Sequence, residues 1–96
     1  MNPVDTLNLD FRALGTFLAV LDEGSVSRAA VRLGVTQSAV SHTLERLRQA
    51  LGDPLFVKSG RGIAPTRYAL LVGPHIRQIL ADLQALPAGP PVSPAT

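Results

Sequence analysis

Apolar residues recur at three- and four-residue spacing near the start of the chain, which is the period of an amphipathic α-helix. These apolar positions are Phe11, Leu14, Phe17, Leu18 and Leu21. Asp10 precedes them as a suitable N-cap, and Gly24 follows them as a stop signal. The pattern therefore predicts a first helix over residues 10 to about 22, with one face turned towards a core.

Two further helices are predicted from capping residues and glycines at suitable distances. Ser25 can cap a short second helix, and Gly34 supplies its C-terminal stop. Thr36 can cap a longer third helix over residues 37 to about 51, which Gly52 would end. Two helices joined by a short turn that contains glycine are typical of a helix-turn-helix motif.

A short apolar run, a glycine-rich tip and a second short run follow the third helix. The runs are residues 55–58 and 63–65, and residues 59–62 between them read Ser-Gly-Arg-Gly. This order predicts a small β-hairpin. Pro65 cannot donate a backbone hydrogen bond, so it keeps the second strand short and at an edge.

A fourth helix is predicted to run from its cap, Thr66, to about Leu86. Within it, five apolar residues alternate four and three positions apart, which is the pattern of a two-heptad coiled-coil seam. These predicted dimerisation residues are Val72, Ile76, Ile79, Leu83 and Leu86. Gly73 and Pro74 interrupt the pattern and predict either a kink or a helix that starts at Pro74.

These elements predict a mainly α fold. It is a winged helix-turn-helix, made of a three-helix core and a small β-hairpin wing over residues 10–65, followed by a linker or dimerisation helix over 66–86. Residues 1–9 lack a clear period and are expected to be a flexible leader. Residues 87–96 carry four prolines and no charge, so we expect a linker to a further domain absent from this chain.

Composition narrows the classes of function. The 96 residues include two histidines and no cysteine, so we expect neither disulfides nor a metal cluster, and no cofactor. No serine or carboxylate pair combines with a histidine in a catalytic arrangement, so an enzyme is not expected. The chain shows neither a secretory leader nor a stretch of about 20 apolar residues, and we expect a cytoplasmic protein.

Charge is distributed unevenly, although the net charge is only +2. Residues 25–67 hold seven basic and two acidic side chains, a balance of +5, whereas the rest of the chain sums to −3. A basic central segment is the electrostatic pattern expected for phosphate binding, and an arginine-rich solvated surface would share it. The interpretation therefore depends on what the third helix presents.

The third helix separates into two faces when its residues are placed about 100° apart. Its core face holds Val40, Leu44, Leu47 and Leu51. The rest of its surface begins with short polar side chains, which suit a recognition helix whose first turns enter a major groove. The residues expected to contact bases are Gln37, Ser38, Ser41, His42 and Arg46. Gln37 is suited to adenine, and His42 and Arg46 are suited to guanine, although any solvent-facing helix is polar.

Phosphate contacts are expected at the starts of the second and third helices and on the hairpin. Free backbone amides at a helix start attract anions. The predicted residues are Ser25, Ser27, Arg28, Thr36 and Lys58. Ser25 and Thr36 also suit a capping role, which does not exclude contact with a phosphate. Arg61 lies between two glycines at the hairpin tip, and we expect it to reach into a minor groove.

Four segments together resemble the N-terminal domain of LysR-type transcriptional regulators, over roughly residues 10–86. They are Ser-Val-Ser-Arg-Ala-Ala at 25–30, Leu-Gly-Val-Thr-Gln-Ser-Ala-Val-Ser at 33–41, Leu-Gly-Asp-Pro-Leu-Phe-Val at 51–57, and Gly-Arg-Gly at 60–62 before Pro65 and Thr66. They stand in the family's order and spacing. Two positions depart from its pattern: Ser38 stands where proline is usual, and Ala69 where many members have glycine.

This resemblance implies a homodimer, paired through the linker helix, that places two recognition helices in successive major grooves of a partly palindromic double-stranded DNA. It implies base contacts by residues matching Gln37, Ser38, Ser41 and His42, and a minor-groove contact by Arg61. It also implies a C-terminal domain outside this chain that binds a small-molecule inducer, and a full-length protein that is a dimer or a tetramer.

The sequence therefore predicts sequence-specific binding of double-stranded DNA by a bacterial transcription regulator. The alternative is a helix-turn-helix used only for protein interaction or dimerisation. The two hypotheses differ in salt dependence, because DNA affinity falls steeply as salt rises. They also differ in the effect of Gln37→Ala and Arg61→Ala, which would leave binding of a protein partner intact.

Overall fold

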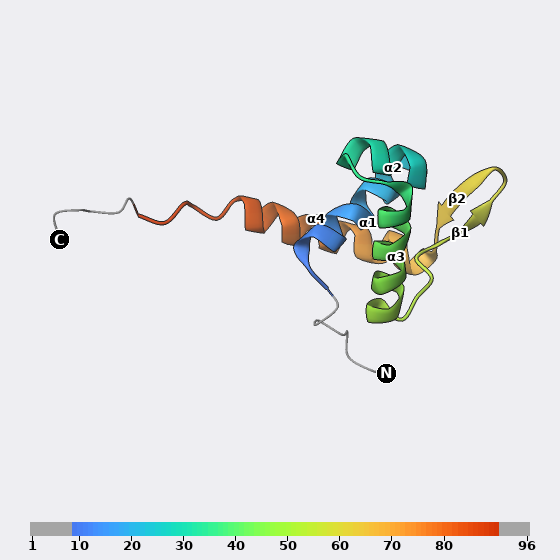
Figure 1. The fold of residues 1–96 in the computed structure, drawn as a ribbon. Helices are drawn as coiled ribbons and strands as arrows, with labels where there is room; N and C mark the ends of the chain where they lie inside the picture. Colours follow the sequence, from blue (N-terminus) through green and yellow to red (C-terminus); the bar gives the residue numbers. More distant parts are fainter. Residues whose placement is uncertain (1–8, 91–96) are drawn as a thin grey trace.

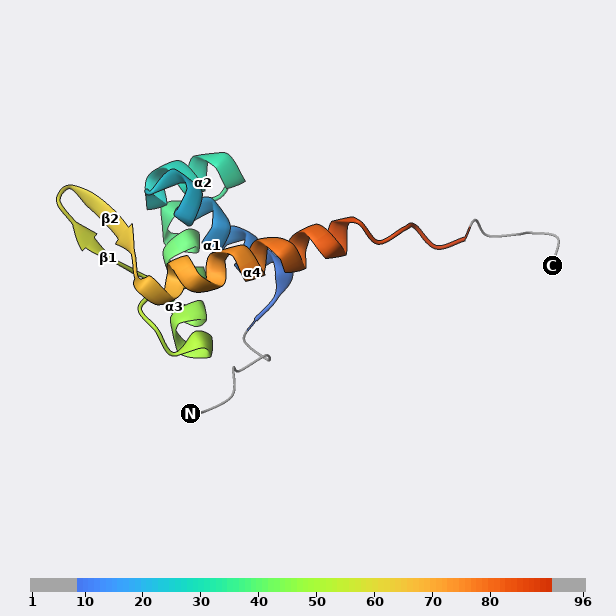
Figure 2. The same ribbon diagram turned by 180° about the vertical axis from the view of Figure 1, so that it is seen from behind.

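Six elements follow one another in the computed structural model, which describes residues 9–90 (Figure 1). They are α1 (Phe11–Glu23), α2 (Val26–Leu33), α3 (Gln37–Leu51), β1 (Phe56–Ser59), β2 (Gly62–Pro65) and α4 (Arg67–Gln84). The hairpin projects from one end of the molecule, and α4 leads away towards the other (Figure 2). This arrangement confirms the predicted winged helix-turn-helix followed by a long helix.

Each helix begins directly after its predicted capping residue. The side chains of Asp10, Ser25, Thr36 and Thr66 each accept a hydrogen bond, between 2.6 and 3.1 Å long, from the backbone N–H three residues further on. Gly24, Gly34 and Gly52 end the first three helices with φ between 65° and 70°. Side chains with a Cβ are disfavoured in that left-handed conformation, so glycine is the suitable residue there.

The core forms where α1 packs against the other three helices. Phe17 and Val20 of α1 and Leu47 of α3 are fully buried, and each large apolar side chain buried in this way stabilises the fold by about 1.5–3 kcal/mol. The ring centroid of Phe17 lies 5.6 Å from that of Phe56, which joins the base of the hairpin to the core. The predicted core face of α3 is confirmed, with Leu51 only half-buried at its edge.

The wing is an antiparallel hairpin in which Phe56 lies opposite Pro65, and Ser59 opposite Gly62. Its first strand begins one residue later than predicted, because Leu55 has a φ of 68° and is not part of a strand. The Leu55 side chain is fully buried. The chain therefore turns at Leu55 to place this side chain in the core before the strand begins.

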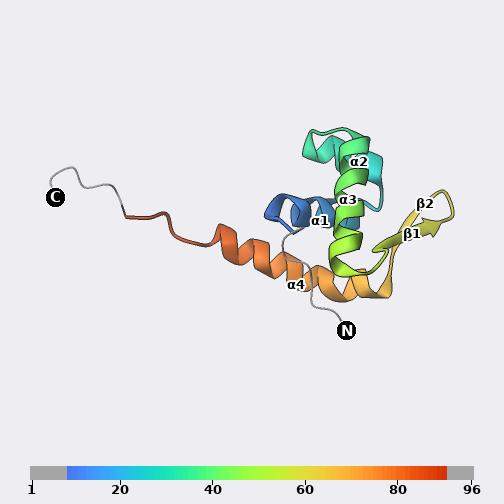
Figure 3. The same cartoon turned by 60° about the horizontal axis from the view of Figure 1, so that its bottom comes forward.

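α4 runs without interruption from Arg67 to Gln84, so the alternative in which the helix starts at Pro74 is wrong. Proline inside a helix removes a hydrogen-bond donor and crowds the residue before it. Gly73 has no Cβ to be crowded by Pro74. The same absence lets α4 approach α1, because a Cβ at position 73 would lie 2.9 Å from Leu21 Cδ2. Figure 3 shows α4 passing below α1.

The predicted seam of α4 divides between two environments. Ile76 is buried in the core of its own chain and Val72 is half-buried against that core, which corrects the assignment of Ile76 to a dimer seam. The same spacing serves packing within a chain and packing between chains, so the pattern alone does not separate them. Ile79 and Leu83 remain exposed, and Leu86 follows the end of the helix.

The two ends of the chain are described only in part. Of the predicted leader, residues 1–8 lie outside the described residues, and Leu9 is half-buried against the core. Of the predicted linker, residues 87–90 form no regular structure, and 91–96 lie outside the described part. Within residues 9–90, no helix has the length and apolar character needed to cross a membrane, and no three His, Asp or Glu side chains gather as metal ligands.

Candidate nucleic-acid interface

The outer face of α3 presents exposed polar side chains in its first two turns. Gln37, Ser38, Ser41 and His42 are all exposed. Thr36 caps the helix directly before them, accepting a hydrogen bond from the Ala39 backbone N–H at 3.0 Å. The structure thus brings together four of the five residues predicted to contact bases, and their contact with DNA stays a prediction.

Arg46, the fifth of these residues, is turned towards α1. Its Nη2 donates to Asp10 Oδ2 at 3.2 Å, which connects α3 to the start of α1. The pKa of Asp10 is lowered, first by the hydrogen bond from the Ala13 backbone N–H and next by that from Arg46. A base contact by Arg46 would require this ion pair to break, and exposed pairs of this kind are weak.

The start of α2 is held by side-chain hydrogen bonds. Ser25 Oγ accepts from the Arg28 backbone N–H at 3.1 Å and lies 3.0 Å from Ser27 Oγ. The capping roles predicted for Ser25 and Thr36 are therefore confirmed. Ser27 and Arg28 are exposed beside this helix start, where the first backbone amides have no partner within the helix and can bind an anion. Their contact with phosphate stays a prediction.

The wing presents two exposed cations, Lys58 in β1 and Arg61 at the tip. Gly60 turns the tip with a φ of 58°. Within residues 9–90, neither cation makes an ion pair, and the same holds for Arg28 and Arg67. The arginines that do pair with carboxylates are Arg32, Arg46, Arg48 and Arg77. Within that part of the chain, the unpaired cations thus lie at the starts of α1, α2 and α4 and on the wing.

Asp53 holds the base of the wing, a role not predicted from the sequence. Its Oδ2 accepts from the Leu55 backbone N–H at 2.8 Å and from the Thr66 hydroxyl at 2.7 Å. The Thr66 backbone N–H in turn donates to the Leu55 carbonyl at 2.8 Å. An aspartate before a turn is a local signal that can be recognised in the sequence. Its bond to Thr66, thirteen residues away, leaves no such local signal.

Arg48 connects the wing to α3. Its Nε donates to the Pro54 carbonyl at 2.9 Å, and its Nη1 donates to Glu45 at 3.1 Å. Arg48 lies on the polar face of α3, so the sequence offered no reason to separate it from the solvated residues. Arg48 thus ties α3 to Pro54, beside the turn that Asp53 holds at the base of the wing.

Residues 11–70 match the family described as bacterial regulatory helix-turn-helix proteins of the LysR family, over more than half of the chain. The chain belongs to the LysR family. This confirms the resemblance inferred from the four sequence segments. The LysR-type domain therefore comprises the helix-turn-helix, the wing and the first turn of α4.

Known LysR-type regulators are similar over most of this domain. The HTH-type transcriptional regulator YbdO of Escherichia coli K12 is 41% identical over 83 residues, which is 86% of this chain and 28% of YbdO. The HTH-type transcriptional activator NagR of a Ralstonia species is 42% identical over 81 residues, 84% of this chain and 27% of NagR. The chain thus spans little more than a quarter of the length of these two relatives.

A solved structure of the DNA-binding domain of CbnR in complex with DNA has the same fold. It superposes with a TM-score of 0.75 at 33% sequence identity, and it covers 79% of this chain and 87% of the CbnR domain chain. The fold predicted from the sequence is thus that of a LysR-type DNA-binding domain.

Proposed function

We propose that this LysR-type domain binds double-stranded DNA sequence-specifically, with α3 in a major groove and the wing in an adjacent minor groove. The observation that carries the proposal is the exposed polar start of α3, flanked by unpaired cations on α2 and the wing. Side chains that donate and accept hydrogen bonds at the start of a recognition helix can distinguish base pairs. The likeness to the CbnR domain, which was solved in complex with DNA, supports DNA binding.

Base recognition is assigned to the first two turns of α3. Gln37 carries an amide that can pair bidentately with adenine, and His42 can donate to the acceptors of guanine. Ser38 and Ser41 are short enough to let the helix approach the base edges. Arg46 can join them only after leaving Asp10, so we assign it a secondary role.

Backbone contacts position the domain on the duplex. The starts of α2 and α3, with Ser25, Ser27, Arg28 and Thr36, would meet phosphates through free amides and hydroxyls. Lys58 would contact a phosphate from the wing. Arg61 would enter the minor groove, where narrow A·T tracts concentrate negative potential.

Two copies would pair through α4 on a partly palindromic site. The exposed residues Ile79 and Leu83 belong to the predicted seam and lie four positions apart on one side of α4. Val72 is half-buried against the core of its own chain, so only its exposed part could contact a second copy. Pairing of one short helix is weak by itself, so we expect DNA binding to reinforce the dimer.

The whole protein would act as a non-enzymatic transcription regulator in the cytoplasm, where the DNA lies. Its longer relatives support a further domain, to which we assign binding of the small-molecule inducer and assembly beyond the dimer. We assign no cofactor to the chain. The alternative function, protein contact without DNA, is an outcome of the experiment that follows.

The deciding experiment is selection from a pool of random duplexes, followed by affinity measurements across a salt series. We expect an enriched inverted repeat with half-sites about one helical turn apart, and a log K that falls steeply with log salt. Gln37→Ala combined with Arg61→Ala should abolish the enrichment. No enriched sequence at low salt would favour the protein-contact alternative. An enrichment that survives the double variant would contradict the roles assigned to Gln37 and Arg61.

A further inference from the structure

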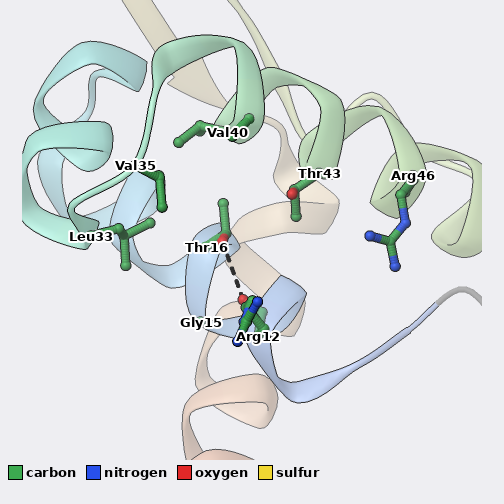
Figure 4. Close-up of a pocket in the computed structure, with 9 residues that line it drawn as sticks. Arg12, Gly15, Thr16, Leu33, Val35, Val40, Thr43 and Arg46 are labelled. Carbon is green, nitrogen blue, oxygen red and sulfur yellow. Dashed lines mark hydrogen bonds between the residues drawn. The ribbon is translucent and has the colours of Figure 1, made fainter.

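A hollow of about 730 Å³ lies between α1, the turn from α2 to α3, and the flank of α3 (Figure 4). Leu33 and Val35 line one end of it, and Arg46 lies at the other. The hollow shares only Arg46 with the residues predicted to read bases. An occupant could therefore be present while the first turns of α3 contact DNA.

Gly15, in the middle of α1, lines this hollow on the side of α1. Glycine in a helix interior destabilises the helix relative to alanine. A Cβ at Gly15 would meet nothing within 4 Å. By contrast, a Cβ at Gly73 would press on Leu21, and the glycines that end the helices have a positive φ. The missing side chain of Gly15 therefore relieves no contact within the described chain, and it leaves the α1 side of the hollow open.

The walls of the hollow are aliphatic and open to solvent. Val35 is 48% exposed and Leu33 is 38% exposed, although neither lies on the predicted DNA-reading face. Exposed aliphatic walls suit an apolar partner and not a nucleic acid backbone. The hollow is open to solvent along these walls, so it would not enclose a small molecule. It suits a peptide segment, because the rest of the partner protein can cover the side that the hollow leaves open.

One side of the hollow is positively charged. Arg12 is exposed, lines the hollow beside Gly15, and makes no ion pair within residues 9–90. Among the described residues, Arg46 pairs with Asp10 and with no other carboxylate. A carboxylate on an apolar segment could therefore pair with Arg12 without displacing a partner in the described chain.

We propose that this hollow docks a short aliphatic segment of a partner protein, with a carboxylate of that segment paired to Arg12. Gly15 lets the segment approach the backbone of α1, and Leu33 and Val35 cover its aliphatic side chains. The partner binds beside the DNA-reading face, so it can join the domain on DNA. This inference does not depend on the DNA contacts proposed above.

The probe is a phage-displayed library of random 12-residue peptides, panned against the whole 96-residue chain. Peptides that also bind the Gly15→Leu variant are removed in each round. We expect enrichment of peptides that combine two or more aliphatic residues with an aspartate or glutamate. One enriched peptide is then synthesised and titrated against each variant by fluorescence anisotropy.

Gly15→Leu should lower the affinity for this peptide at least tenfold. Arg12→Gln should lower it about two- to fivefold, as expected for the loss of an exposed ion pair. Ala81→Leu places the same side chain at an exposed position of α4 and should leave binding of the peptide unchanged. Gly15→Ala should raise Tm by about 2–6 °C, because alanine favours the helix, and should lower the affinity for the peptide. This variant therefore separates loss of docking from loss of fold.

Three results of the peptide selection and titration would overturn the proposal. They are an absence of enrichment after counter-selection, peptide binding that survives Gly15→Leu, and peptide binding that is indifferent to Arg12→Gln. Amide chemical-shift changes away from Gly15, Val35 and Thr43 would also contradict it. The titration is repeated with a selected duplex bound, and mutual exclusion of peptide and DNA would contradict simultaneous binding.

Discussion

Arg77 Nη2 donates to Asp22 Oδ1 at 2.7 Å, which joins the middle of α4 to the end of α1 across 55 positions of sequence. Arg32 of α2 lies 3.5 Å from the other oxygen of the same carboxylate. Asp22 therefore connects three helices. Leu21, which precedes Asp22 in α1, lies close to Gly73 of α4. The Asp22–Arg77 ion pair and this close approach together set the position of α4 on the core.

The first prediction concerns stability at acid pH. The pKa of Asp22 is lowered, chiefly by the hydrogen bond from Arg77, and the pKa of Arg77 is raised by the same contact. A carboxylate whose pKa is lowered by folding stabilises the fold above its unfolded pKa, about 3.9, and loses that contribution as pH falls through the folded value. Asp22→Asn should remove this part of the decline below about pH 4.

Urea denaturation at several pH values between 2 and 7 measures the effect. The side chain of Asp22 is one-third exposed, so we expect a loss of no more than about 1 kcal/mol at pH 7. Arg77→Leu should give a similar loss, and the double variant should be little worse than either single variant. Parallel pH profiles for the wild type and Asp22→Asn would refute the assignment.

The second prediction concerns the base of the wing. Asp53→Ala removes the acceptor of both the Leu55 N–H and the Thr66 hydroxyl, beside a Leu55 backbone that holds a positive φ. Leaving partly buried donors without a partner costs about 1–3 kcal/mol. Urea denaturation should show this loss, whereas Asp82→Ala, at an exposed position of α4, should stay within about 0.5 kcal/mol. Equal stability of the two variants would contradict the role of Asp53.

The third prediction separates base recognition from phosphate contact. Gln37→Ala should relax discrimination at one base position by about 1–3 kcal/mol while leaving Tm unchanged, because Gln37 is exposed. Lys58→Ala should weaken all sequences alike and lower the salt slope by about 1. Competition binding with single-base variants of the selected duplex, across a salt series, distinguishes the two. A uniform loss from Gln37→Ala would place it among the phosphate contacts.

Local sequence signals predicted the helices well, because each boundary depends on residues within one turn. The side chains of Asp10 and Thr36 each accept a hydrogen bond from the backbone N–H three residues further on. Gly52 ends its helix because it adopts the left-handed conformation. Contacts between distant residues left no such signal, as with Asp22 and Arg77. Ile76 was assigned to the wrong environment because heptad spacing describes one face of a helix and not what covers that face.

The predicted base-contacting set shows the same division. Gln37, Ser38, Ser41 and His42 share one exposed face because helical geometry alone puts them there. The long side chain of Arg46 is directed by its ion pair with Asp10, which lies 36 positions earlier. The position of Arg46 on the helix does not reveal that partner. The hollow beside Gly15 was not predicted at all, since it exists only where α1 meets the turn before α3.

The fourth prediction uses the division of the α4 seam. Ile76 is 6% exposed within its own chain, so Ile76→Ala should destabilise the fold by about 2–5 kcal/mol whether or not a dimer forms. Ile79 is 48% exposed, so Ile79→Ser should change the free energy of unfolding of the monomer by less than about 1 kcal/mol while reducing dimer formation on a palindromic duplex. Sedimentation with and without the duplex, beside urea denaturation of dilute protein, separates the two effects. A dimer unaffected by Ile79→Ser and Leu83→Ser would show that another surface joins the two copies, because Ile79 and Leu83 are the exposed large apolar residues in the last two turns of α4.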